Sequence, residues 1–121
     1  MLSPGTSRAL IFLLCILTSA ANVQAQTSRA SSAASYLERG NEWLEKGELD
    51  RDIADYDLAI AFDARAAIYN NRGLAKQRKG DLAGALSDYN RAIELNPRYP
   101  EALINRGLFH AEQGDLNAAI S

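Results

Sequence analysis

Apolar residues recur every three or four positions through most of the chain, which is the spacing of one face of an α-helix. The pattern is interrupted at Gly47-Glu48, Gly80-Asp81 and Gly114-Asp115. Glycine at such a point favours the left-handed backbone that ends a helix, and the acidic residue after it can cap the next helix. Asn96-Pro97 marks a further helix end, because the residue before proline is disfavoured in the helical region. The pattern therefore predicts an all-α chain with helices over about 34–46, 49–62, 67–79, 82–95, 101–113 and 116–121.

Residues 66–99 form a unit that recurs along the chain. Arg72-Gly73 returns as Arg106-Gly107 after 34 positions and is preceded by Arg39-Gly40, 33 positions earlier. A helix–turn–helix unit of this period resembles the tetratricopeptide repeat (TPR) family. The resemblance implies a right-handed solenoid of helical hairpins with about two and a half repeats. We expect the repeats over residues 33–65, 66–99 and 100–121, the third being truncated.

The N-terminal segment predicts export. Arg8 precedes an apolar run from Ala9 to Leu17, and Val23-Gln24-Ala25 fits a small-x-small cleavage site. We expect residues 1–25 to be a secretory signal peptide and residues 26–32 to be a disordered polar linker. The protein would then be periplasmic or secreted. The alternative is an uncleaved anchor, which is the one case in which we expect contact with a membrane.

Candidate catalytic chemistry is sparse. His110 is the single histidine, and its repeat position favours a packing role. The single cysteine, Cys15, lies in the expected signal peptide, so the mature chain would lack a thiol. The acidic residues follow helix faces and caps rather than a ligand spacing, and the formal net charge of −2 does not favour nucleic acid. We therefore expect no enzyme activity, no cofactor, no metal and no nucleic acid.

The resemblance implies that the first helices of successive repeats form a groove for a partner protein. Amides flanked by aliphatic side chains suit an extended peptide or a helix, although the aliphatic residues also pack between repeats. Related co-chaperones clamp a carboxylate with two Asn and three basic residues, and here the basic positions hold aliphatic residues, so we do not expect such a clamp. The function expected is a non-catalytic adaptor, and the alternative is the repeat module of a cell-envelope enzyme whose catalytic part lies elsewhere. The groove residues expected are Leu37, Asn41, Asn70, Asn71, Leu74, Gln77, Ile104, Asn105 and Leu108.

Three further expectations concern packing. The recurrence of Arg and Asp in register predicts the ion pairs Arg39–Asp55 and Arg72–Asp88. Asp52 falls where the other repeats have alanine, so it should be either paired or wetted by solvent. Leu116, Ala119 and Ile120 should pack against helix 101–113 but cover only part of it, because the last helix is too short to close the array, which predicts self-association through the C-terminal end.

Overall fold

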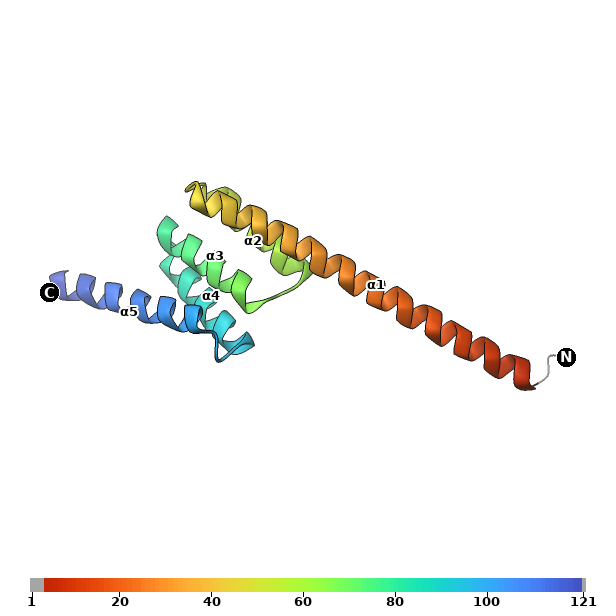
Figure 1. Cartoon of the computed structure of the whole chain (residues 1–121). Helices are drawn as coiled ribbons and strands as arrows, with labels where there is room; N and C mark the ends of the chain where they lie inside the picture. Colours follow the sequence, from red (N-terminus) through yellow and green to blue (C-terminus); the bar gives the residue numbers. More distant parts are fainter. Residues whose placement is uncertain (1–3, 121) are drawn as a thin grey trace.

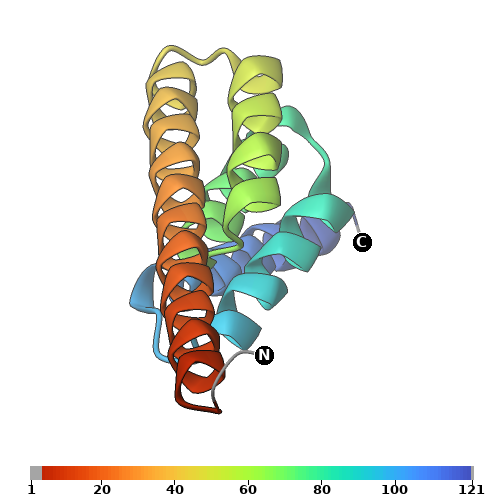
Figure 2. The ribbon, with the colours of Figure 1, turned by 90° about the vertical axis from the view of Figure 1, so that its right-hand side faces the viewer.

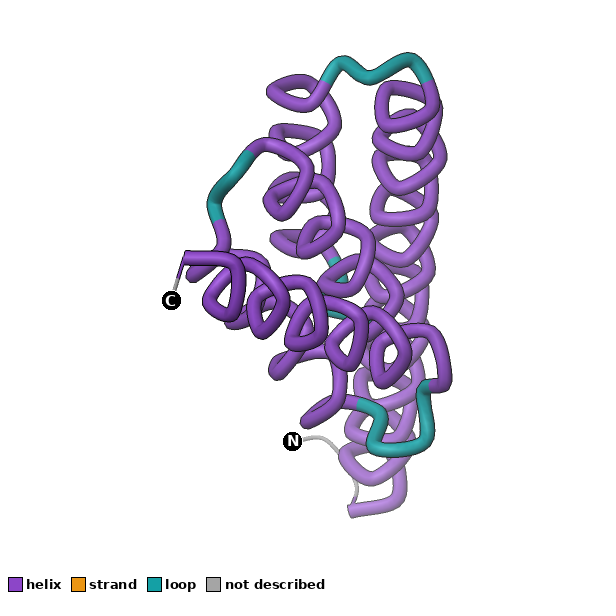
Figure 3. Tube along the Cα trace, turned by 90° about the vertical axis from the view of Figure 1, so that its left-hand side faces the viewer, coloured by secondary structure: helices purple, strands orange, loops and turns teal. Residues whose placement is uncertain are grey.

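The computed structural model describes the backbone of residues 4–120 and the side chains of residues 8–115. Residues 4–120 contain no strand, and Figure 3 shows helices joined by short loops. The all-α prediction is therefore confirmed. The helices are α1 (Pro4–Glu45), α2 (Leu49–Phe62), α3 (Ala66–Lys79), α4 (Leu82–Leu95) and α5 (Pro100–Ile120).

The helices stack as antiparallel hairpins in chain order (Figures 1 and 2), α1 with α2 and α3 with α4, and α5 follows. Each hairpin closes where a tyrosine of the second helix meets a glycine of the first. A Cβ added at Gly40 would lie 2.6 Å from Cε1 of Tyr56, and one at Gly73 would lie 2.9 Å from Cε1 of Tyr89. Both tyrosines are fully buried, so the missing side chain at each glycine lets an aromatic ring fill the helix crossing.

The turn inside the second hairpin forms as its sequence predicts. Gly80 ends α3 with φ of 94°, in the left-handed region. Asp81 caps α4, since its side chain accepts a hydrogen bond of 3.0 Å from the Gly84 N–H. The helix then ends at Leu95, directly before Asn96 and Pro97.

The third hairpin does not form, so the prediction of separate helices over 101–113 and 116–121 is wrong. α5 continues through Gly114 to Ile120 as one helix. A straight helix keeps its backbone hydrogen bonds through Gly114, whereas the few residues beyond a turn would make a helix too short to be stable by itself. The expected packing of Leu116, Ala119 and Ile120 concerns side chains outside the described residues.

The prediction of a disordered linker over residues 26–32 is also wrong, because this segment is part of α1. Ala33 is fully buried, and the Ala30 carbonyl accepts a hydrogen bond of 3.5 Å from Arg65 at the start of α3. The Ser32 hydroxyl donates a hydrogen bond of 3.0 Å to the Ser28 carbonyl. Small residues next to an anchored helix therefore extend that helix, because each further residue adds a hydrogen bond without a new nucleation cost.

The first half of α1 projects away from the other helices (Figure 1). Its apolar side chains, Leu10 to Leu17 among them, are half or more exposed. Within the described residues this is the one helix that is long and apolar enough to cross a membrane, a test that signal sequences also pass.

Candidate functional site

Four amide side chains connect the first helices of the three repeats. Oδ1 of Asn41 on α1 accepts a hydrogen bond of 2.9 Å from Nδ2 of Asn71 on α3. Asn70 donates to the neighbouring Asn71 at 3.4 Å, and Oδ1 of Asn70 accepts 3.0 Å from Nδ2 of Asn105 on α5. These residues, all predicted for the groove, form one continuous chain of amides, which we call the amide chain.

Tyrosine hydroxyls from the second helices hold the amides in place. Tyr56 donates to Oδ1 of Asn41 at 2.7 Å, and Tyr89 donates to Oε1 of Gln77 at 2.7 Å. Burial raises the pKa of both phenols, that of Tyr89 to about 12, so both keep their protons at neutral pH. Gln77 in turn donates from Nε2 to Glu112 of α5 at 2.8 Å, which gives a second polar connection between α3 and α5.

The predicted aliphatic residues divide into two groups. Leu37 is half-buried and packs against the core that contains Tyr56, so for this residue the packing alternative holds. Leu74 is half-buried as well. Ile104 and Leu108 on α5 are 59% and 57% exposed. Their spacing of four places them on one side of α5, and Leu108 lies three residues after Asn105, so both exposed side chains lie next to the end of the amide chain. Together the nine predicted residues make up what we call the first-helix face.

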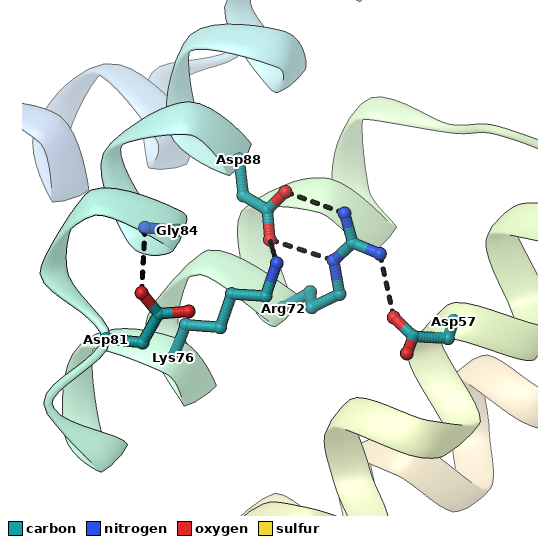
Figure 4. A network of polar contacts seen from close by, with 6 residues as sticks. All are labelled: Asp57, Arg72, Lys76, Asp81, Gly84 and Asp88. Atoms are coloured by element: carbon teal, nitrogen blue, oxygen red, sulfur yellow. Dashed lines mark hydrogen bonds and ion pairs between the residues drawn. The ribbon is translucent and has the colours of Figure 1, made fainter.

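The predicted ion pairs are confirmed and lie between the helices of each hairpin. Arg39 binds Asp55 through two hydrogen bonds of 2.6 and 2.7 Å. Arg72 binds Asp88 in the same bidentate manner, at 2.8 and 2.7 Å (Figure 4). Arg39 lowers the pKa of the Asp55 carboxyl below its usual range, which keeps that partner charged.

Arg72 also crosses the boundary between repeats, which was not predicted. Its Nη1 donates to Asp57 of α2 at 2.7 Å, and Lys76 adds a contact of 3.1 Å to Asp88 (Figure 4). Arg106 makes the corresponding backward contact, to Asn90 at 2.9 Å. Asp57 and Asn90 are 33 positions apart, so the repeat register contains the signal for this second contact.

Asp52 has neither a hydrogen-bond partner among the described residues nor exposure to solvent, so both predicted outcomes are wrong. Its side chain is fully buried, and neither oxygen has a hydrogen-bond partner among the described residues. Burial raises the pKa of its carboxyl to about 6. The Ile53 N–H and the charge of Arg78 oppose this shift only in part. The alanine in the matching position of the next repeat, Ala85, is likewise fully buried, so this register position is buried in both described hairpins.

No group of three or more candidate metal ligands occurs within the described residues. His110 is exposed and meets Phe109 edge-on at 5.5 Å, so its predicted packing role is limited to that contact. A hollow of about 470 Å³ between α1 and the end of α2 is lined partly by Asn22 and Ala25, which belong to the expected signal peptide.

The fold and the amide chain define a solenoid of helical hairpins with a polar face on its first helices. A TPR repeat profile matches residues 78–114. The second TPR domain of Spaghetti (RPAP3), bound to the HSP90 peptide SRMEEVD, is 31% identical with a TM-score of 0.74, covering 83% of this chain and 87% of that one. Its first TPR domain, bound to the same peptide, is 30% identical with a TM-score of 0.68, covering 74% of each chain.

The second TPR domain of human RPAP3, in complex with the HSP70 peptide SGPTIEEVD, is 32% identical with a TM-score of 0.63 and covers 78% of this chain and 77% of that one. No curated protein matches the chain. The identity and coverage of the matched domains establish that this chain belongs to the tetratricopeptide repeat family.

Proposed function

We propose that this chain is a non-catalytic adaptor that holds a peptide or helix of a partner protein on its first-helix face. The observation that carries the proposal is the amide chain from Asn41 to Asn105, which spans three helices on one face. Solved TPR domains of similar fold have peptides bound, which supports a protein partner of this kind.

The hydrogen bonds within the amide chain determine what a partner would have to offer. The oxygens of Asn41, Asn70 and Asn71 each accept from a neighbouring group. Each amide nitrogen carries two hydrogens and is used at most once within the chain, so N–H donors remain. Backbone carbonyls of an extended segment are suitable acceptors for these donors, and Ile104 and Leu108 would contact its apolar side chains.

Site-specific photo-crosslinking tests this proposal. A photoreactive residue at Leu108, on the first-helix face, should capture a partner from an extract of the native host. The same residue at Leu58, exposed on α2, serves as the control. Asn71→Ala should abolish capture at Leu108, whereas Asn90→Asp, which removes an amide on α4 and keeps a partner for Arg106, should leave it unchanged. Equal capture at both positions, or capture insensitive to Asn71→Ala, would refute the proposal.

We propose further that the chain is exported and that residues 1–25 are removed. The exposed apolar run of α1 supports this, since a folded domain in water rarely leaves so many large apolar side chains uncovered. Intact mass of the exported protein tests the proposal: the expected mature chain begins at Gln26. A mass that retains residues 1–25 would instead support the membrane anchor.

A further inference from the structure

Acidic side chains border the first-helix face on both outer helices. We infer that this face selects a partner segment that carries basic residues, in contrast to the acidic peptides bound to the similar RPAP3 domains. The inference rests on the proposed function, because it specifies the charge of the segment that the same face would bind.

On α1 the acidic border is made of Glu38, Glu42 and Glu45, all exposed. Glu38 lies three residues before Asn41 and Glu45 lies four residues after it, so both are on the same side of the helix as this amide. Glu42 directly follows Asn41. Glu38 also occupies the repeat position of Asn71 and Asn105, both members of the amide chain. A carboxylate therefore stands where the other two repeats present a neutral amide.

On α5 the border is made of Glu101 and Glu112, which are also exposed. Glu112 is fixed beside the face by the hydrogen bond that it accepts from Gln77 at 2.8 Å. Glu101 lies four residues before Asn105, which is one helical turn. A segment that follows the amide chain from α1 to α5 would thus meet carboxylates at both ends.

The basic residues of the middle helix do not balance this charge. Arg72 and Lys76 bind Asp88, and Lys79 binds Asp50. Arg78 is the remaining basic side chain of α3; it is exposed, and it sets one positive charge against the five carboxylates of the two borders. Potentials of one sign around a binding face attract segments of the opposite sign and disfavour segments of the same sign.

Three peptides of equal length test the inference by fluorescence anisotropy on the full chain. They are SRMEEVD, its amide counterpart SRMQQVN and its basic counterpart SRMKKVK, whose side chains carry net charges of −2, +1 and +4. We expect the basic peptide to bind tightest and the acidic peptide weakest. The double variant Glu38→Gln, Glu112→Gln should weaken binding of the basic peptide by about 5–10-fold, the effect of two exposed charges, and salt should reduce this difference. Glu94→Gln on α4, where Glu94 pairs with Arg91, is the matched control and should change nothing.

The outcomes separate the inference from the proposed function. If all three peptides bind equally and Asn71→Ala abolishes binding, the adaptor proposal stands and the charge selection is refuted. Tighter binding of the acidic peptide, or an order that the double variant leaves unchanged, also refutes the charge selection. If none of the three peptides binds, both the peptide-binding proposal and the inference drawn from it are refuted.

Discussion

Replacing the buried carboxylate of Asp52 with alanine should stabilise this protein at neutral pH. Asp52 is fully buried without a hydrogen-bond partner among the described residues, and its pKa rises from 3.8 to about 6 in the folded chain. The folded state therefore prefers the protonated form. A shift of roughly two pKa units corresponds to about 3 kcal/mol of stability that is present in acid and lost at pH 7.

The sign of the pH dependence follows from the direction of the shift. Below the unfolded pKa, near 3.8, the carboxyl is neutral in both states and destabilises nothing through its charge. As the pH rises towards and through about 6, the unfolded chain ionises first, so the folded chain loses stability. Asp52→Ala removes this loss. Alanine has a higher helix propensity than aspartate, whereas aspartate near the start of a helix interacts favourably with the helix dipole. Each effect is below about 1 kcal/mol, and the two nearly cancel.

Thermal unfolding followed by circular dichroism measures the effect. At pH 7 Asp52→Ala should raise the free energy of unfolding by about 2–3 kcal/mol, or the Tm by roughly 10 °C or more for a domain of this size. This difference should disappear as the pH falls to about 4. Asp50→Ala, an exposed position on the same helical turn, is the control: it removes a surface ion pair with Lys79 and should lower the stability slightly, which is the opposite sign. A variant less stable than the parent at pH 7, or one with the parent's pH slope, would show that Asp52 has a partner or is hydrated.

Further expectations follow from the packing and from the cap of α4. Gly73→Ala should destabilise the protein by about 1–3 kcal/mol in chemical denaturation, because the new Cβ meets a buried ring and a backbone carbonyl. Gly107→Ala should instead stabilise the protein by about 0.5–1 kcal/mol, since the new Cβ would meet no described atom within 4 Å outside the backbone of its own helix. A stability change of the same sign for both glycines would contradict the packing. In a double-mutant cycle, Arg72→Met and Asp88→Leu should show a coupling of about 1–3 kcal/mol, and additive losses would mean that the bidentate pair is not formed in solution. Asp81→Ala should cost about 1 kcal/mol through loss of the cap on α4, measured by urea midpoint with an unchanged m-value. Self-association through the C-terminal end remains a prediction, and light scattering at rising protein concentration would detect it.

Local chemistry made the second hairpin predictable from sequence. Gly80, Asp81 and Pro97 act on the backbone within a few residues, so the ends of α3 and α4 follow from the sequence directly. The continuation of α5 through Gly114 was not predictable in this way. A turn at that glycine is stable only if the helix after it buries a face, and burial is a tertiary property.

The same division holds for the first-helix face. The repeat register identified the amide positions, but not the direction of their hydrogen bonds, which depends on tyrosine hydroxyls that approach from the second helices. It also identified Asp52 as an exception without showing how deeply the position is buried. Glu112, whose contact with Gln77 joins residues 35 positions apart, was missed although that distance is one position from the repeat period.

The double contact of Arg72, with Asp57 in one repeat and Asp88 in the next, has a consequence for how the array unfolds. In repeat proteins the cooperativity of unfolding depends on the free energy of each interface between neighbours relative to that of each repeat. A guanidinium shared by two hairpins raises the interface contribution, so opening either hairpin disrupts a contact of the other. Backbone amides in α2 and α4 should therefore exchange with solvent in a single cooperative event, whereas the C-terminal turns of α5 exchange independently and earlier.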